Sequence, residues 1–320
     1  MKPFWKDVVV SCIMGLIVPG MVLSLGVALW DQGQGGEEPT VAHVIQERPK
    51  TMLTVQHGDE LVQMELDAYL TGVVLAEMPA SFAEEALKAQ AVVARTYTMR
   101  AAEGKRKHAD AAVCTDSACC QGYIAPEAYL EAGGTGRSIE KIRTAVEETE
   151  GLVLTYEGKL IEATYFSCSG GTTEDAVAVW GSDVPYLKSV ESPGEEHATH
   201  FTDEMVCSAD EFRAALCKDL VGAPDSWFGH ITYTAGGGVD TIEICGVSYR
   251  GTEIRKLLGL RSTVFSIRTD GDLLTIKTRG FGHRVGMSQY GADAMADGGS
   301  DCAAILAHYY PGTTLERMAD

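Results

Sequence analysis

An uncharged segment near the N-terminus constrains this chain more than any other feature. Residues 8–30 (VVVSCIMGLIVPGMVLSLGVALW) are 23 consecutive residues without an acidic or basic side chain. A helix of this length spans the core of a bilayer with some tilt, whereas the apolar region of a cleaved signal peptide is about 7–15 residues long. No clear A-x-A cleavage motif follows the segment. We therefore predict a retained transmembrane helix, with a cleaved signal peptide as the alternative.

The charges at the two ends of this segment predict its orientation. Lys2 and Lys6 precede it, whereas acidic residues follow from Asp31 onwards. Basic residues stay on the cytoplasmic side of a membrane, so the rest of the chain is expected outside the cytoplasm. The predicted parts are a cytoplasmic tail, the transmembrane anchor, a linker containing Gly, Glu and Pro, and an extracytoplasmic domain. They comprise residues 1–7, 8–30, 31–50 and 51–320.

The net charge limits the kind of partner that the chain binds, and the number of cysteines limits the disulfides that it forms. The chain of 320 residues has a formal net charge of −19, which disfavours nucleic acid or an anionic membrane surface as the main partner. Nine cysteines are an odd number, so at least one of them is outside any disulfide within the chain. Cys207 and Cys217 are close in sequence, but spacing alone does not decide whether they pair.

Helices and short strands are mixed along the extracytoplasmic part. A helix is expected over residues 84–103, where Ser81 and Glu84 have the spacing of a capping box and Gly104 ends the pattern. The other expected elements are hairpins that turn at 58–59 and 157–158, helices over 66–76, 138–150, 209–220, 252–260, 287–297 and 301–310, strands within 238–250 and 263–280, and a loop over 168–200. This mixture predicts an α+β fold with antiparallel strands, in two lobes around a central cleft.

Glu77 is the first candidate for chemistry. It ends the apolar run VVLA immediately before Met78 and Pro79. A partly desolvated carboxylate has a raised pKa, which a general acid needs near neutral pH. Lys88 and Arg95, seven residues apart, share a helix face that is able to orient a carboxylate or a sugar, whereas Gln90 points elsewhere. The alternative is that Glu77 forms only a surface ion pair or a helix cap.

The segment HADAAVCTDSACC, residues 108–120, is a candidate metal site. His108, Cys114 and Cys120 are of the ligand types that zinc prefers, at spacings that a loop allows. Cys119 is a fourth candidate, although adjacent cysteines rarely bind one ion together. With three protein ligands, water would complete the tetrahedron and leave a position open for catalysis. The alternative is a disulfide from Cys114 to Cys119 or Cys120.

A glycine-rich segment, GFGHRVGMSQYGA at residues 280–292, is a third candidate. Its glycines allow backbone to approach a ligand or another strand closely around His283, Ser288 and Gln289. It lacks both the GK[ST] sequence and the spacing of a phosphate-binding loop. A tight packing turn with a hydrogen-bonded histidine is the alternative. Residues 165–195 add aromatic and hydroxyl side chains, which suit sugar rings as well as any loop-rich surface.

In their order along the chain, these segments resemble the stage II sporulation protein D family. The resemblance covers about residues 52–315 and rests on four stretches. They are AYLTGVVLAEMPASFAEEALKAQAVVARTY, H-x5-C-x5-CQGY, SCSGGTTEDAVAVWGSDVPYLKSVESP, and GFGHRVGMSQYGA followed by ILAHYYPGT. Two features depart from the pattern: Arg284 stands where many relatives have glycine, and Cys119 is an additional thiol.

The resemblance implies roles for single residues. The catalytic glutamate of the family corresponds to Glu77. Side chains suited to holding the glutamate or the sugar form the expected substrate-binding set, which comprises Lys88, Gln90, Arg95, Tyr186, His283 and Gln289. The zinc-binding subset of the family implies a zinc ion with a structural or modulatory role. Its ligands correspond to His108, Cys114 and Cys120.

The activity implied by the resemblance is that of a membrane-anchored lytic transglycosylase of endospore formers. Such an enzyme cleaves the bond between N-acetylmuramic acid and N-acetylglucosamine in peptidoglycan during engulfment, preferring strands without stem peptides. Glu77 would act as acid and then as base, because the sugar's own C6 hydroxyl closes a 1,6-anhydro ring and no water has to be activated.

The resemblance also implies partners and a location. The partners are glycan strands, an amidase–endopeptidase and a membrane scaffold protein, and no nucleic acid is expected. The domain would lie between the mother-cell and forespore membranes. The alternatives are a zinc-dependent wall hydrolase that uses the His/Cys cluster, and a non-catalytic glycan binder that enhances a wall amidase.

Overall fold

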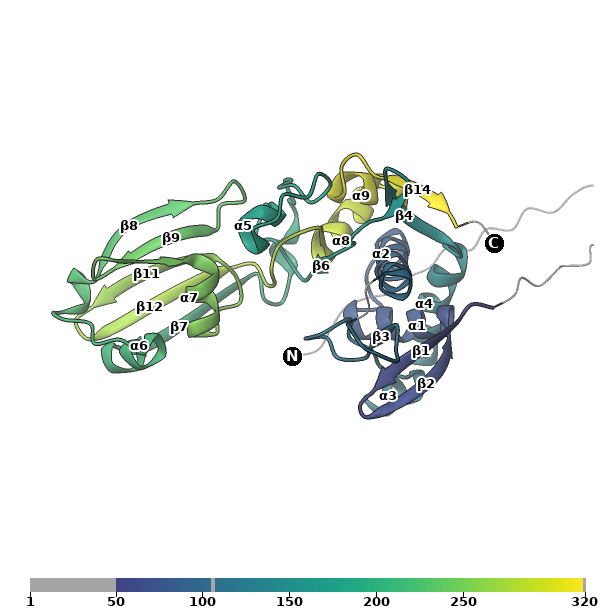
Figure 1. Cartoon of the computed structure of the whole chain (residues 1–320), viewed down its shortest axis with the longest axis horizontal. Helices are drawn as coiled ribbons and strands as arrows, with labels where there is room; N and C mark the ends of the chain where they lie inside the picture. Colours follow the sequence, from purple (N-terminus) through teal and green to yellow (C-terminus); the bar gives the residue numbers. More distant parts are fainter. Residues whose placement is uncertain (1–49, 105–106, 319–320) are drawn as a thin grey trace, which may run out of the picture. The chain divides into compact units, whose positions relative to one another are not determined.

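A computed structural model of the chain describes residues 50–104 and 107–318 (Figure 1). The predicted tail, the predicted transmembrane helix and all but the last residue of the predicted linker lie outside the described residues. Within the two described ranges, no helix is both long enough and apolar enough to cross a membrane.

The described chain begins with a hairpin and two helices. β1 (Met52–His57) pairs antiparallel with β2 (Glu60–Glu65), and α1 (Leu66–Glu77) follows directly. Helix α1 ends at Glu77 because Met78 precedes Pro79, and a residue before proline disfavours the helical conformation. Met78 is accordingly extended, with φ −125° and ψ 138°. After a short connection comes α2 (Glu84–Glu103).

The first hydrophobic core forms around α2. This helix contacts α1, α4 (Gly136–Glu148), α8 (Gln289–Asp297) and α9 (Cys302–Tyr309), which lie around it in Figure 1. The smaller elements of this part are β3 (Val113–Cys114), α3 (Pro126–Glu131), β4 (Leu152–Tyr156), β5 (Lys159–Leu160), β6 (Tyr165–Phe166), α5 (Ala176–Trp180), the 3-10 turn η1 (Glu195–His197), β13 (Met287–Ser288) and β14 (Thr314–Arg317). Their sheets are ordered β2-β1-β3, β14-β4-β5 and β13-β6.

The second hydrophobic core is built by residues 202–279, which are inserted between β6 and β13. It contains two antiparallel three-stranded sheets, ordered β10-β9-β8 and β11-β12-β7, together with two helices. The elements are β7 (Thr202–Ser208), α6 (Ala209–Leu216), the 3-10 turn η2 (Pro224–Ser226), β8 (Phe228–Tyr233), β9 (Val239–Ile244), β10 (Val247–Arg250), α7 (Gly251–Leu258), β11 (Val264–Asp270) and β12 (Leu273–Arg279). Residues of β12 alternate between exposed and buried positions, as a half-buried sheet requires.

The predicted α+β class with antiparallel strands is confirmed. Only two short pairs are parallel among the described strands, β1 with β3 and β6 with β13. Both predicted hairpins form, and the predicted helices are present. The arrangement as two lobes around a glycan cleft stays a prediction.

The predicted capping box of α2 is wrong. The N-cap is Ala83, and Ser81 makes no capping hydrogen bond. The backbone N–H of Ala83 instead donates to the carboxylate of Asp293 on α8, at 2.7 Å. The acceptor at the start of α2 is therefore a side chain 210 residues away in the sequence, and not the Ser81 hydroxyl that the local pattern predicted.

Three further boundaries differ from the prediction. Helix α6 ends at Leu216, because Cys217 takes a left-handed conformation with φ 52°. Helix α8 begins at Gln289, since Met287 and Ser288 pair with β6. The predicted loop over 168–200 contains helix α5.

Candidate functional site

Glu77 lies at the C-terminal end of α1 and is half-buried. Its Oε1 accepts a hydrogen bond from the backbone N–H of Gly122, at 2.7 Å. A Cβ atom at position 122 would lie 3.0 Å from the same oxygen, a tight contact that glycine avoids. The carboxylate is therefore fixed by main chain from a segment far away in the sequence.

Two polar side chains complete the surroundings of Glu77. Gln121 is buried, donates to Thr98 Oγ1 on α2 at 3.0 Å, and accepts from the hydroxyl of Tyr165 at 3.4 Å. Burial raises the pKa of the Tyr165 phenol well above its usual value, and the negative charge of Glu77 acts in the same direction. Tyr165 therefore remains a neutral hydroxyl, able to donate a hydrogen bond beside the carboxylate.

His283 joins this group through Tyr165. Burial lowers the pKa of His283 to about 4, with the positive charge of Arg255 acting in the same direction and a hydrogen bond to the Tyr165 backbone acting against it. Its Nδ1 accepts from the backbone N–H of Val285 at 3.1 Å. At neutral pH the ring is thus uncharged, with its proton on Nε2.

The pairing of β6 with β13 brings the glycine-rich segment to Tyr165. Met287 lies opposite Tyr165, and Ser288 lies opposite Phe166. A Cβ atom at Gly286, whose φ is 83°, would lie 2.1 Å from the carbonyl oxygen of Thr164. The glycine predicted to allow a close backbone approach does so against another strand.

Lys88 and Arg95 share a helix face, as predicted, and this face meets α4. Lys88 forms ion pairs with Glu85 at 2.8 Å and Glu148 at 2.6 Å, and it lines a pocket of about 280 Å³ against α4. Arg95 is fully buried and pairs with Asp67 at 3.2 Å in the first turn of α1. Because Asp67 and Glu77 are ten positions apart, they are separated by roughly 15 Å along the helix.

Arg95 also binds the backbone at the C-terminal end of α4. It donates to the carbonyl oxygens of Val146 and Thr149, at 3.0 and 2.7 Å. These contacts tie α2 to α4, and the structure brings neither Lys88 nor Arg95 into contact with Glu77.

Two predicted glutamines are buried with unused hydrogen-bonding groups. Both amide atoms of Gln90 and the amide nitrogen of Gln289 have no hydrogen-bond partner among the described residues. Gln90 precedes Tyr97 by seven positions, so the two share a face of α2. Tyr97 in turn lies close enough to Tyr165 to raise its pKa. Gln90 thus lies on the α2 face nearest the Glu77 group.

Tyr186 makes its contacts with Glu162 and Tyr156. Its hydroxyl accepts from the backbone N–H of Glu162 at 3.1 Å, and its ring packs against Tyr156 with centroids 5.4 Å apart.

The predicted metal ligands come together, and the fourth cysteine joins them. Ligand atoms of His108, Cys114, Cys119 and Cys120 all lie within 4.8 Å of one another. The Nε2 of His108 is 3.5 Å from the Sγ of both Cys119 and Cys120, and those two sulfurs are 4.0 Å apart. Tetrahedral zinc with ordinary bond lengths would place nitrogen and sulfur about 3.6 Å apart and two sulfurs about 3.8 Å apart. The donor set and its spacing therefore fit a zinc ion.

A turn allows the adjacent cysteines to reach the same point. The backbone N–H groups of Cys119 and Cys120 both donate to the carbonyl oxygen of Asp116, at 3.0 and 2.8 Å. All eight cysteines in the described residues are free thiols, which excludes the alternative disulfide from Cys114. It also leaves Cys207 and Cys217 unpaired.

The cluster directly precedes the segment that contacts Glu77. Cys120 is followed by Gln121 and Gly122, which bind Thr98 and Glu77 respectively. An ion held by the cluster would therefore order the start of this segment.

The sequence analysis missed the neighbours of Glu77. Gln121 and Gly122 lie within CQGY, and Tyr165 lies within the aromatic and hydroxyl-rich stretch. A buried glutamine and a glycine after a metal cluster carry no chemical signal of their own, so only their contacts identify them.

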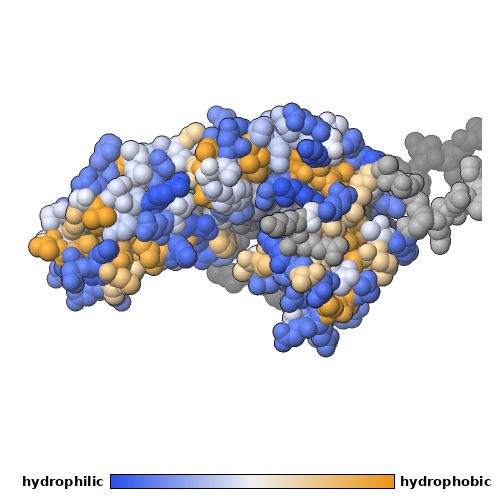
Figure 2. Space-filling view, in the orientation of Figure 1, coloured by the Kyte–Doolittle hydropathy of each residue, from blue (hydrophilic) through white to orange (hydrophobic). Residues whose placement is uncertain are grey.

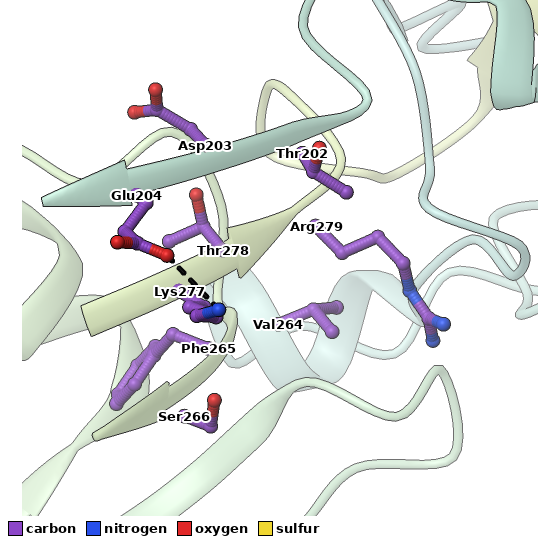
Figure 3. A pocket seen from close by; sticks show the side chains of 9 residues that line it. All are labelled: Thr202, Asp203, Glu204, Val264, Phe265, Ser266, Lys277, Thr278 and Arg279. Atoms are coloured by element: carbon purple, nitrogen blue, oxygen red, sulfur yellow. Dashed lines mark ion pairs between the residues drawn. The ribbon is translucent and has the colours of Figure 1, made fainter. Parts of the chain in front are cut away.

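A further pocket, of about 670 Å³, lies on the sheet of β7, β11 and β12 (Figure 3). Lys277 and Glu204 form an ion pair there, 3.0 Å apart, and Arg279 points away from this pair in the view. Because Lys277 and Glu204 neutralise each other on the sheet face, we assign no reactive group to this pocket.

Comparisons with known proteins relate the chain to a family. Residues 56–156, which contain Glu77 and the His/Cys cluster, match the family model described as Stage II sporulation protein. The chain is 39% identical over 286 residues to the stage II sporulation protein D of Bacillus amyloliquefaciens, covering 88% of this chain and 81% of that protein. It is 39% identical over 280 residues to the stage II sporulation protein D of Bacillus subtilis, covering 86% and 81%.

A more distant similarity links the chain to an amidase enhancer of Bacillus subtilis. The two are 30% identical over 299 residues, which cover 77% of this chain and 40% of the enhancer.

Proposed function

The chain belongs to the stage II sporulation protein D family, and from this premise we propose that it is a peptidoglycan lytic transglycosylase acting during sporulation. Its reaction cleaves the bond between N-acetylmuramic acid and N-acetylglucosamine and forms a 1,6-anhydro sugar. Strands that have lost their stem peptides are the preferred substrate.

The position of Glu77 carries this proposal. It is a half-buried carboxylate held by the Gly122 N–H, with the neutral hydroxyl of Tyr165 nearby. Its hydrogen bond comes from a backbone N–H, and among the described residues no hydrogen bond links it to a second carboxylate. A hydrolase normally uses two carboxylates, one of them to activate water, whereas ring closure within the sugar requires only one.

The proposed reaction transfers one proton in each direction. Protonated Glu77 donates to the glycosidic oxygen as the bond from this oxygen to C1 of the muramic sugar breaks, and positive charge develops at C1. The resulting carboxylate then accepts the proton of the C6 hydroxyl of the same sugar. The C6 oxygen bonds to C1, which closes the anhydro ring and returns Glu77 to its protonated form.

The surrounding residues have positioning roles in this scheme. The Gly122 N–H fixes the direction of the Glu77 carboxyl group. Gln121 holds Tyr165 beside it. His108, Cys114, Cys119 and Cys120 would hold zinc with four protein ligands, the arrangement of structural zinc sites. The zinc would stabilise the loop before Gly122 and takes no part in proton transfer.

The proposal extends to location and partners. The anchor predicted over residues 8–30 would hold the domain on the outer side of the membrane, between mother cell and forespore. There it would act with an amidase–endopeptidase, which strips stem peptides, and with a membrane scaffold protein.

The similarity to an amidase enhancer favours a second candidate function. In that case the domain binds glycan and stimulates a wall amidase without cutting the strand itself. The zinc-dependent hydrolase is disfavoured, because four protein ligands leave no open position for water.

Mass analysis of products from stripped glycan strands tests the two candidates. We expect the full chain to release fragments that end in a 1,6-anhydro sugar, lighter by one water than hydrolysis products. Glu77→Gln should lower the rate by at least about a hundredfold. Glu131→Gln is the matched control, because Glu131 also ends a helix but is exposed.

Each other outcome rejects the proposal in a different way. Fragments with ordinary reducing ends would indicate a hydrolase, and full activity of Glu77→Gln would exclude Glu77 as the acid. Absence of any product, together with faster cleavage by an added wall amidase, would establish the enhancer function instead.

A further inference from the structure

Trp180 is a large exposed aromatic side chain next to the Glu77 group. It is the last residue of α5, and 45% of its surface is accessible. Its ring lies 5.3 Å from that of His283, at an interplanar angle of 55°. His283 in turn contacts Phe166, with centroids 5.7 Å apart. One face of the indole is thus supported by protein while much of the ring remains open to solvent.

Helix α5 is held in place although it has only five residues. The N–H of Ala176 donates to the carbonyl oxygen of Leu187 at 3.0 Å. The carboxylate of Asp175 accepts from the N–H of Ser189 at 2.6 Å, and Arg250 donates to the carbonyl oxygen of Ala178 at 2.7 Å. These contacts fix Trp180 before any ligand arrives, which lowers the entropy cost of binding to it.

Contacts lead from Trp180 to Glu77. Trp180 packs on His283, His283 interacts with the backbone of Tyr165, and Tyr165 lies beside Glu77. Trp180 is therefore the exposed end of this chain of contacts.

An arginine without an acidic partner lies near the same histidine. Arg255 on α7 is half-buried and is close enough to His283 to lower the pKa of the ring. Its Nε donates to the carbonyl oxygen of Leu260 at 3.2 Å, but it forms no ion pair with any carboxylate of residues 50–104 or 107–318. In a chain with a net charge of −19, a half-buried cation without a carboxylate is positioned for an anionic ligand.

We propose that Trp180 and Arg255 form a subsite for a muramic sugar of the glycan strand, with the sugar ring stacked on the exposed indole face and its lactyl carboxylate bound by the guanidinium. This inference rests on the proposed function, since it takes the ligand to be a peptidoglycan strand. A stem peptide converts the lactyl carboxylate into an amide and removes its charge. Arg255 thereby selects strands from which stem peptides have been removed.

Binding measurements on the full chain carrying Glu77→Gln test the subsite without cleavage. Calorimetry would compare a stripped glycan oligosaccharide, the same oligosaccharide with stem peptides, and an uncharged oligomer of N-acetylglucosamine. Trp180→Ala should weaken binding of the stripped and the uncharged oligosaccharide by about tenfold, and Trp180→Phe should retain most of the affinity. Tyr233→Ala, which removes an exposed aromatic ring on β8, is the control and should bind normally.

Arg255→Gln should act only on the charged ligand. We expect its affinity for the stripped oligosaccharide to fall about tenfold, to that for the uncharged oligomer, which itself binds unchanged. Arg268→Gln is the control, because Arg268 is an exposed arginine on β11. Normal binding by Trp180→Ala, or an undiminished preference of Arg255→Gln for the stripped strand, would overturn the inference.

The fluorescence of Trp180 gives an independent readout. The other tryptophan of the described residues, Trp227, is only 1% exposed in the second core, so a glycan that stacks on Trp180 changes the emission of that residue alone. The emission change should disappear in Trp180→Phe. If the unsubstituted chain forms no anhydro product while this signal persists, the proposed reaction fails and the subsite stands. If products form without such a signal, the subsite fails and the reaction stands.

Discussion

Burial of Gln90 destabilises the folded state, because no hydrogen bond among the described residues compensates for it. Its side chain is fully buried on α2, and neither amide atom has a partner among the described residues. Each buried polar group left without a hydrogen bond costs roughly 1–3 kcal/mol. Such a residue is expected where a side chain is kept for use on a ligand, and a functional role of Gln90 is what the family resemblance predicts.

Replacing Gln90 by methionine should separate stability from activity. Gln90→Met keeps the shape and removes the unpaired amide, so the free energy of unfolding in urea should rise by about 1–2 kcal/mol. Glycan cleavage, or glycan binding in the Glu77→Gln background, should fall at the same time. Gln121→Met is the matched control: this amide is also buried but is hydrogen-bonded, so its loss should destabilise the protein by about 1–3 kcal/mol. Unchanged activity in a stabilised Gln90→Met would assign Gln90 to packing alone.

At the scale of secondary-structure elements, the sequence predicted helices and hairpins well and their ends less well. The hairpin at Gly58-Asp59 and the stop of α1 before Pro79 depend on local backbone preferences, which a sequence displays directly. The start of α2 depends on Asp293, which comes from the other end of the chain. A local capping pattern at Ser81 could not reveal this competing acceptor.

In the loop over residues 107–121, too, the sequence predicted which residues are involved better than their geometry. Three of the four clustered ligands were predicted from residue type and spacing. Cys119 was ranked lower because adjacent cysteines rarely reach one ion, and the turn at Asp116 removes that difficulty. Ligand geometry depends on the turn, which spacing alone does not specify.

Cobalt substitution measures how many thiolates the loop provides. The chain should bind one metal ion, and its cobalt form should show intense sulfur-to-metal absorption from three thiolates. Cys119→Ser should lower this absorption by about a third and weaken the affinity for the metal at least about tenfold, because one ligand of the ion is lost. Cys217→Ser, which changes an exposed thiol outside the cluster, should leave both quantities unchanged. An unaltered spectrum in Cys119→Ser would establish the three-ligand set of His108, Cys114 and Cys120.

At the scale of the whole described domain, the site is assembled from segments that are distant in sequence. Glu77, Gly122, Tyr165 and His283 come from four separate segments. The sequence singled out Glu77 and His283 by their chemistry, but gave no sign that Gly122 and Tyr165 lie between them. Lys88 and Arg95 share a face as predicted, yet that face meets α4. Helical periodicity specifies which residues lie together and leaves open what they contact.

Polar and apolar side chains are mixed on the visible face of the molecule (Figure 2). Figure 2 shows a mainly hydrophilic face with apolar side chains dispersed among polar ones. A heavily hydrogen-bonded cation, by contrast, lies inside: Arg284 and Glu174 form an ion pair at 3.0 Å with each side chain only 1% exposed.

This ion pair joins the two hydrophobic cores. Arg284 donates to the carbonyl oxygens of Ser169 and Thr172 beside the first core, and to that of Gly236 in the inserted segment. Glu174 accepts from Gly238 of the same segment at 3.2 Å. Arg284 also holds a left-handed backbone conformation, with φ 67°, which normally favours glycine. The contacts of its guanidinium therefore offset a strained backbone.

Arg284→Gly tests this connection between the cores. Glycine relieves the backbone strain, but the Glu174 carboxylate is then buried without its cation, so the free energy of unfolding should fall by roughly 2–4 kcal/mol. Because the lost contacts join the two cores, urea unfolding followed by far-UV circular dichroism, which reports mainly the helices of the first core, should no longer coincide with that followed by tryptophan fluorescence. Glu157→Gly, at an exposed left-handed position in the β4–β5 turn with φ 51°, should change stability by less than about 1 kcal/mol. If Arg284→Gly is as stable as this control, or unfolds with coincident transitions, the ion pair does not couple the cores.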